Sequence, residues 1–232
     1  SLSKFDNAFK KVYSYHQNSS KNLATNLLFT ENYFVDNEQS DAFTYLYDDL
    51  NRLTMVARNN IMNKRYTYDG LGRLSREDNA DLNKTFVFTY DKSGNILSRK
   101  EYAFTVGSLD DKAPTKTVNY TYQRNQLWSY DGEGCSYNVL GNPIIYRGKM
   151  ATWTKIHRLA SFNGVDFAYN YAGIRTSKTF DEIITKYAYD GETLIAEQKG
   201  DDLNTKLVYY YGFDGVTAFT YGGENYFYQK NA

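Results

Sequence analysis

The stretch Tyr66-Thr67-Tyr68-Asp69-Gly70-Leu71-Gly72-Arg73-Leu74 (YTYDGLGRL) decides the fold of this chain. Its two tyrosines alternate with a threonine, and this period of two is typical of a β-strand that presents one aromatic face. Asp69 can accept hydrogen bonds from the backbone ahead of it, and Gly72, three residues later, can adopt a positive φ. Arg73 and Leu74 then begin a returning strand. The stretch therefore predicts a β-hairpin closed by a type I turn.

Related signatures recur along the chain. Each signature has two residues separated by one position, and at least one of the two is aromatic. An Asp, Asn or Gln follows the second of them. The aspartates at positions 48, 69 and 91 lie 21 and 22 residues apart, and a period of about 20 residues is typical of stacked supersecondary units. Asn51 takes the glycine position of the first copy, and asparagine tolerates a left-handed conformation well. The structural residues assigned to these repeats are Tyr45, Tyr47, Asp48, Tyr66, Tyr68, Asp69, Gly72, Phe88, Tyr90, Asp91, Gly94, Tyr120, Tyr122, Tyr169, Gly173, Tyr187, Tyr189, Asp190 and Gly191.

The regularity of the repeats divides the sequence into two parts. Residues 1–42 are interpreted as an irregular N-terminal segment with a degenerate repeat, and Asn18 to Leu28 is expected to include a short helix. Residues 43–232 are expected to form the array of β-hairpins. Within it the spacing stretches at residues 106–116, which contain Gly, Asp and Pro, so this stretch predicts an inserted loop between two strands.

Composition indicates how the chain packs and argues against two classes of partner. Tyrosine carries the packing, with 24 residues in a chain that is 17% aromatic, and its ring buries apolar area while its hydroxyl stays wet or hydrogen-bonded. The sequence has 27 basic and 27 acidic residues and a formal net charge of +0. This balance argues against a nucleic-acid surface. No apolar run approaches the roughly 18 residues of a membrane helix, so no membrane span is expected.

Residues with catalytic potential are few. His16, His157 and Cys135 could join carboxylates in a Cys-His or paired-acid site, but such a site needs convergent geometry that the spacing does not supply. The acidic residues follow the strands at turn positions, and His157 is expected to pack beside Trp153 and Arg158. The single cysteine excludes an internal disulfide and is interpreted as a small buried residue. We therefore predict no enzyme activity and no catalytic, cofactor or metal site in this chain.

The units at Tyr66–Leu74 and Phe88–Ile96 resemble the YD repeats of RHS-type proteins, a family that includes the shells of insecticidal toxin complexes and the teneurins. The stretches Tyr187–Glu197, Tyr211–Gly215 and Tyr226–Tyr228 are similar to the last repeats before the RHS-associated core of bacterial members. The resemblance implies an all-β fold of stacked antiparallel β-hairpins that form an open curved sheet, part of a YD-repeat β-solenoid shell. It also implies a secreted or cell-surface bacterial protein, with neighbouring repeats and an enclosed C-terminal toxin or effector as partners. Bacterial relatives use an Asp-Pro motif for self-cleavage, and this sequence contains no Asp-Pro pair.

A carbohydrate-binding, lectin-like module is the alternative function. Rows of Tyr and Phe can stack on sugar rings, and glycan binding has been proposed for similar YD repeats. Trp128 and Trp153 are the candidate stacking residues because they lie outside the Y-x-Y pattern. The competing interpretation is that the rings of each repeat pack against the rings of neighbouring hairpins. A strip of hairpins also has unpaired strand edges, so self-association is expected.

Overall fold

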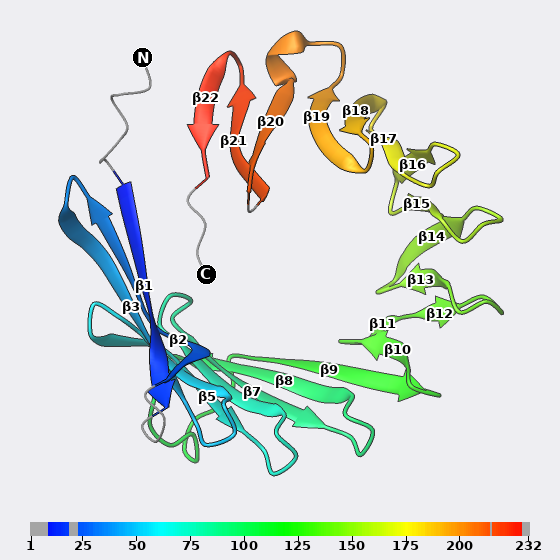
Figure 1. Ribbon diagram of the computed structural model, residues 1–232. Coiled ribbons are helices and arrows are strands. Elements are labelled where there is room, and N and C mark those ends of the chain that lie inside the picture. Colours follow the sequence, from blue (N-terminus) through cyan, green and yellow to red (C-terminus); the bar gives the residue numbers. More distant parts are fainter. Residues whose placement is uncertain (1–8, 19–22, 214, 229–232) are drawn as a thin grey trace. The chain divides into compact units, whose positions relative to one another are not determined.

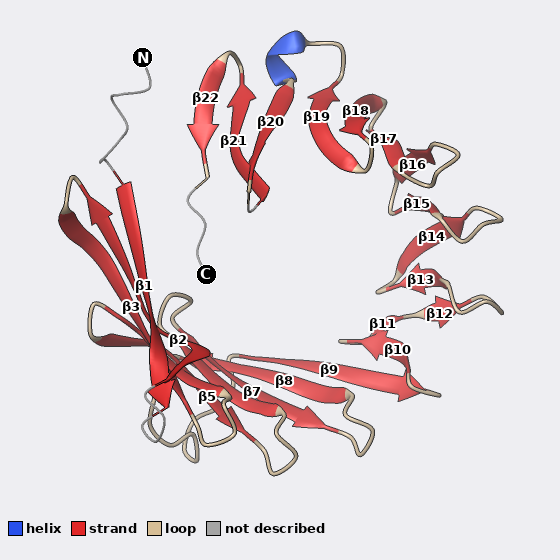
Figure 2. Ribbon diagram, in the orientation of Figure 1, coloured by secondary structure: helices blue, strands red, loops and turns tan. Residues whose placement is uncertain are grey.

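The computed structural model describes residues 9–18, 23–213 and 215–228, and these residues form β-strands and connecting turns with one short 3-10 helix (Leu203–Thr205), as Figures 1 and 2 show. Each strand pairs antiparallel with its sequence neighbours, in two eleven-stranded sheets without crossovers. The predicted all-β fold of stacked antiparallel hairpins is therefore confirmed. The first sheet contains β1 (Phe9–Asn18), β2 (Leu23–Val35), β3 (Glu38–Tyr47), β4 (Leu53–Arg58), β5 (Ile61–Tyr68), β6 (Leu74–Asn79), β7 (Lys84–Tyr90), β8 (Ile96–Ala103), β9 (Lys116–Gln123), β10 (Gln126–Tyr130) and β11 (Glu133–Gly134). The second contains β12 (Ser136–Tyr137), β13 (Pro143–Tyr146), β14 (Lys149–Trp153), β15 (Leu159–Phe162), β16 (Val165–Tyr169), β17 (Arg175–Phe180), β18 (Ile183–Asp190), β19 (Thr193–Lys199), β20 (Leu207–Gly212), β21 (Gly215–Tyr221) and β22 (Glu224–Phe227).

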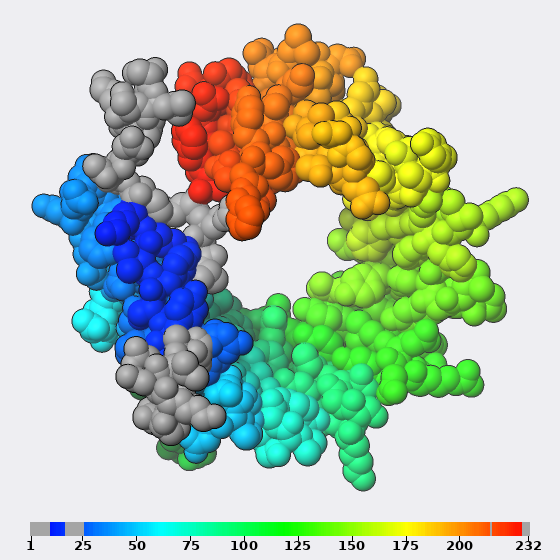
Figure 3. Space-filling model, viewed as in Figure 1, coloured from blue at the N-terminus to red at the C-terminus, as the bar shows by residue number. Residues whose placement is uncertain are grey.

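The chain divides into two compact units, Ser1–Leu127 and Trp128–Ala232, and each is described by itself. Within a unit, strands that follow one another in sequence also lie against one another, so neighbouring colours adjoin in Figure 3. This arrangement follows from the hairpin connections, because short turns bring consecutive strands side by side.

The first strands differ from one expectation. The short helix predicted within Asn18 to Leu28 is wrong for residues 23–28, which belong to β2, while residues 19–22 lie outside the described part. The physical reason is pairing with β1, because Leu23, Ala24 and Leu28 are the partners of Asn18, Gln17 and Tyr15. Such tertiary pairing overrides the weak local preference of a short stretch.

The turns that follow the aromatic strands have the geometry that the sequence predicts. After β5, the amide of Gly72 donates to the carbonyl of Asp69 at 2.9 Å, and the amide of Asp69 donates to the carbonyl of Arg73 at 2.8 Å. The strand register shifts by one residue between Thr67 and Tyr68, as expected when a left-handed residue forms a bulge after a type I turn. A left-handed φ occurs at the fourth turn position in Asn51, Gly72, Gly94, Gly141 and Gly173.

Polar side chains occupy much of the interior. The largest fully buried side chains are Tyr33, Glu31, Val118, Thr85 and Asp78, and two of these five carry a carboxylate. A thin sheet has no deep apolar interior, so its buried carboxylates must be paired and hydrogen-bonded to be tolerated.

Candidate functional site

The aspartate of each turn holds both the turn and the returning strand. Oδ1 of Asp69 accepts hydrogen bonds from the amides of Leu71 and Arg73, both at 2.9 Å. Oδ2 accepts from Nε of Arg73 at 2.7 Å. The amide of Arg73 is the main cause that lowers the pKa of Asp69, and the Arg73 guanidinium adds to the effect. The group is therefore an ionised structural acceptor, which is the opposite of what a general acid needs.

The neighbouring turns repeat this arrangement with one variation. Asp48 binds the amide and the guanidinium of Arg52, and the amide of Arg52 is the largest cause of its lowered pKa. In the Asp91 turn, Asn95 replaces arginine and donates Nδ2 to Oδ2 at 2.8 Å. That side-chain bond is the largest cause that lowers the pKa of Asp91. The position after the glycine therefore supplies a donor back to the turn carboxylate.

Successive turns are joined by a contact that we name the turn staple. The guanidinium of Arg52 lies over the ring of Tyr68 in the next repeat, with 4.5 Å between the guanidinium carbon and the ring centroid. The hydroxyl of Tyr68 donates to the carbonyl of Leu53, the residue after Arg52, at 2.7 Å. The turn staple thus combines a cation–π contact with a hydrogen bond between neighbouring repeats.

The next pair of turns contains the same turn staple. Arg73 lies 4.5 Å from the ring centroid of Tyr90, and the hydroxyl of Tyr90 donates to the carbonyl of Leu74 at 2.6 Å. Arg73 also donates Nη1 to the carbonyl of Asp91 at 2.8 Å. Burial raises the pKa of Tyr90, so its hydroxyl stays protonated and keeps donating. In these two repeats the ring of the Y-x-Y unit packs under an arginine, a contact that sequence reasoning missed.

A further copy of the repeat lies at Trp153, where four signature residues are replaced, by Ala151, Trp153, Thr154 and His157. The amide of Thr154 donates to the carbonyl of Arg158 at 2.8 Å, and the amide of His157 donates to the carbonyl of Thr154 at 3.1 Å. His157 has a φ of 58° and so takes the glycine position. Indole Nε1 of Trp153 donates to the carbonyl of Pro143 at 2.7 Å, as the tyrosine hydroxyl does in a turn staple. Trp153 therefore lies outside the Y-x-Y pattern in sequence, yet it takes the place of the second tyrosine in this turn.

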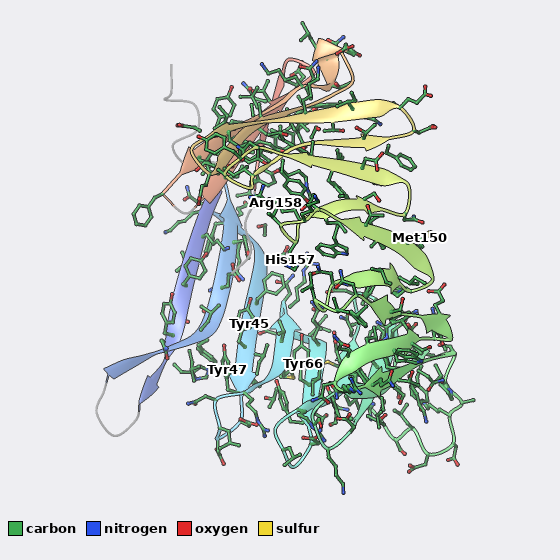
Figure 4. All side chains as sticks on the ribbon, turned by 90° about the vertical axis from the view of Figure 1, so that its right-hand side faces the viewer. Tyr45, Tyr47, Tyr66, Met150, His157 and Arg158 are labelled. Atoms are coloured by element: carbon green, nitrogen blue, oxygen red, sulfur yellow. The ribbon has the colours of Figure 1, made fainter. Side chains whose placement is uncertain are left out.

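Figure 4 labels His157 and Arg158 in this substituted turn, together with Tyr45 and Tyr47 of β3 and Tyr66 of β5. Arg158 continues the series, since its guanidinium carbon lies 5.8 Å from the ring centroid of Tyr169 and Nη1 donates to the carbonyl of Asn170. The hydroxyl of Tyr169 donates to the carbonyl of Leu159 at 2.9 Å. The Arg158-Leu159 pair, which matches Arg73-Leu74, is the sequence signal that could have found this copy.

Away from the turns, buried carboxylates stabilise the strands of the first unit. Glu31 is 1% exposed and pairs with Lys11. Its two oxygens accept from the hydroxyls of Tyr33 at 2.6 Å and Tyr45 at 2.9 Å. Burial, and then the neighbouring Glu31, raise the pKa of Tyr45 well above its usual value. Tyr45 therefore serves a buried ion pair that its place in the repeat does not reveal.

A second buried carboxylate anchors the loop that follows β8. Asp78 is fully buried and pairs with Arg65 at 2.8 Å and Arg76 at 2.7 Å. The same two guanidiniums donate to the carbonyls of residues 105–107 at distances between 2.6 and 3.0 Å. The loop, residues 104–115, lies between β8 and β9 and is thus tied to strands that lie far from it in sequence.

The other residues singled out from the sequence lie apart from these contacts. Ring nitrogen Nε2 of His16 lies 3.3 Å from the carbonyl of Tyr45. Cys135 is 3% exposed, and its sulfur accepts from the amide of Arg147 at 3.3 Å. Trp128 on β10 is 52% exposed. Phe88 lies on β7, Tyr120 and Tyr122 lie on β9, Tyr187, Tyr189 and Asp190 lie on β18, and Gly191 follows with a φ of 60°.

The described residues contain neither a cluster of metal ligands nor a membrane-spanning helix. No group of three or more His, Cys, Asp or Glu side chains among them could hold a metal ion. In the same part of the chain, no helix is long and apolar enough to span a membrane.

Comparisons with known proteins point in one direction. No family model matches the sequence. The chain is 33% identical over 176 residues to the tRNA3(Ser)-specific nuclease WapA of Bacillus spizizenii, and 31% identical over 175 residues to the tRNA nuclease WapA of Bacillus subtilis. Each match covers 71% of this chain and 7% of the relative. Among solved structures, the crystal structure of TcdB2-TccC3-TEV matches with a TM-score of 0.54 and 15% identity, over 92% of this chain and 12% of that one. That likeness shows a shared fold.

Proposed function

We propose that this chain is a non-catalytic wall segment of a YD-repeat, RHS-type protein, and that the complete wall encloses a C-terminal toxin or effector. The repeat signature, the similarity to two WapA proteins and the fold shared with TcdB2-TccC3-TEV all support this proposal. The chain spans only 7% of the length of either WapA relative, so the nuclease activity in their names is proposed to lie outside the matched region.

The turn staple is the observation that carries the proposal. In Tyr68 and Tyr90 the ring face contacts an arginine of the preceding repeat, and the hydroxyl donates to a backbone carbonyl of the same repeat. Groups engaged in this way hold neighbouring hairpins together and are not available to a substrate. A chain built from such contacts resists separation of its strands, which is what a wall requires.

The wall is proposed to belong to a secreted or cell-surface bacterial protein. Its partners are further repeats of the same polypeptide, added beyond β1 and β22 at the ends of the two sheets, and the enclosed effector. Strand edges accept other strands through their backbone groups, so self-association of the isolated chain is part of the proposal.

An antibody raised against this chain tests the proposal in the producing cells. Immunoblots of the cell surface and of the medium are expected to detect a polypeptide much longer than 232 residues. Its C-terminal region should resist added protease while the wall is folded and become cleavable after mild denaturation. A free protein of about 232 residues, or a C-terminal region that is cleaved equally fast in both conditions, would overturn the proposal.

A lectin-like module is the second candidate, and the exposure of Trp128 favours it. This indole is 52% exposed, whereas Trp153 donates its Nε1 to a backbone carbonyl. A glycan array probed with the chain and with Trp128→Ala separates the two functions. Binding that is lost in the variant would indicate a lectin, and the absence of glycan binding would favour the wall function.

A further inference from the structure

A hollow on one face of β16 to β19, strands that lie side by side in Figure 1, has the size of a ligand site. Its volume is about 440 Å³, and pockets for small molecules typically measure about 300 to 1,000 Å³. The side chains that line it include Val165, Lys178, Phe180, Ile183, Thr185 and Lys199. The hollow lies within the second unit and plays no part in the turn staples.

The strand register places two lysines on either side of one buried threonine. Lys178 is the direct partner of Thr185 on one adjacent strand, and Lys199 is its partner on the other. Adjacent strands lie about 4.8 Å apart, so the Cα atoms of the two lysines are separated by about 10 Å on the same face. Their flexible stems allow both ammonium groups to approach one point above Thr185, which is 8% exposed.

The two ammonium groups have no counter-ion among the described residues. Neither Lys178 nor Lys199 forms a side-chain ion pair or hydrogen bond there, although Lys186 on the opposite face pairs with Asp201 at 3.6 Å. Two unpaired positive charges on one face repel each other, and an anion placed between them relieves that repulsion. This end of the hollow therefore favours a carboxylate.

Apolar side chains continue the hollow toward the hairpin end. Phe180 and Ile183 are direct partners, two residues nearer to the turn than the lysine row, and they are 59% and 43% exposed. Covering these side chains with an apolar group removes their surface from water, which is favourable. Val165 completes the apolar surface.

An acidic residue lies at the far end and sets the charge of the ligand. Asp181 follows Phe180 in the turn and also lines the hollow. A ligand whose carboxylate lies between the lysines would meet Asp181 with its other end, so a second carboxylate there would be repelled. We propose that this hollow binds a small apolar monocarboxylate, with its carboxylate between Lys178 and Lys199 and its apolar group over Phe180 and Ile183. This inference is independent of the wall function.

Calorimetric titration of the full chain with decanoate tests the site. Decanoate is expected to bind, while decanol lacks the charge and decanedioate carries a second one, so both should bind more weakly. Because exposed charge pairs are screened by ions, the Kd for decanoate should rise with added salt. Lys178→Ala and Lys199→Ala should each raise that Kd by about two- to fivefold. Phe180→Ala should raise it as well.

Matched controls lie on the opposite face of β18. Lys186→Ala and Ile184→Ala remove a lysine and an exposed apolar residue of the same strand and should leave the Kd for decanoate unchanged. Thermal unfolding checks that each variant folds, and the decanol, decanedioate and salt measurements decide the question on the parent chain alone. No binding of decanoate, equal binding of decanol, or an equal effect of Lys186→Ala would overturn the proposal.

Discussion

Gly173 lies directly beneath the guanidinium of Arg158, so that a Cβ at this glycine would approach Nη2 of Arg158 at 2.5 Å. The glycine thus has two requirements, a φ of 91° and an open face for the arginine of the preceding turn. Gly94 has a similar φ of 90° but nothing within 4 Å of its Cβ position. Comparing the same substitution at the two glycines therefore separates the cost of backbone strain from the cost of losing the turn staple.

We expect Gly173→Ala to destabilise the chain more than Gly94→Ala. Both substitutions add the strain of a positive φ, about 1 kcal/mol. In Gly173→Ala the arginine must also move and lose its contacts with Tyr169 and Asn170, which adds about 0.5 to 1 kcal/mol. Urea unfolding measures both changes. Combining Gly173→Ala with Arg158→Ala should cost less than the sum of the single effects, and strict additivity would contradict the contact.

Removing one hydroxyl tests the hydrogen bond of a turn staple. Tyr90→Phe deletes the bond to the carbonyl of Leu74 while the ring remains under Arg73, so we expect a loss of about 0.5 to 1.5 kcal/mol in the free energy of unfolding. Tyr171, which is 100% exposed, supplies the control. Tyr171→Phe should have no measurable effect, and equal losses in the two variants would count against the turn staple.

The loop after β8 should depend on the charge of Asp78. Asp78→Asn removes the buried anion that pairs with Arg65 and Arg76. Because the two arginine side chains stay partly exposed, we expect a loss of about 1 to 3 kcal/mol in the free energy of unfolding, less than the cost of breaking a fully buried pair. Hydrogen exchange measured by mass spectrometry should show faster exchange in residues 104–115 than in the parent chain. Asp81→Asn is the control because this carboxylate is half exposed. Unchanged exchange in the loop would show that the anchor lies elsewhere.

Acid should weaken the turns in a defined direction. The pKa values of Asp48, Asp69 and Asp91 are lowered in the folded chain, so the folded state holds fewer protons than the unfolded state. Their stabilisation is complete above the unfolded carboxyl pKa of about 3.9 and is lost as the pH falls through the lower folded values. Unfolding midpoints measured at a series of pH values from 6 downward should decrease as the pH passes through this window. Asp69→Asn, which keeps an acceptor but has no charge, should show a flatter profile, and an identical slope would refute the assignment.

The turns were the most predictable part of the fold because their causes are local. An aspartate three residues before a glycine contains all the information that a type I turn needs, and the strand pattern on either side sets the hairpin. The copy at Trp153 was hidden because Thr154 and His157 perform the same backbone roles with different side chains. A search for residue types misses a repeat that keeps the backbone geometry of the turn but has different side chains.

Contacts between repeats could not be read in the same way. The spacing of Arg52 and Tyr68 does not reveal that the two meet, since that depends on how far each hairpin is offset from the next. Glu31 and Asp78 look like surface residues in the sequence, yet both are buried against cations from other strands. Arg65 lies 41 residues from its acceptor at Val106. Long-range charge pairing of this kind has no short-range signal.

The turn staple has a direction along the chain, and this direction bears on how the protein is made. The arginine and the accepting carbonyl, as in Arg73 and Leu74, always belong to the earlier turn, while the ring, as in Tyr90, belongs to the later one. During synthesis the earlier hairpin is completed first. Each hairpin that leaves the ribosome can therefore dock its ring onto a folded predecessor, so the array can grow from its N-terminal end while the rest of the chain is still being translated.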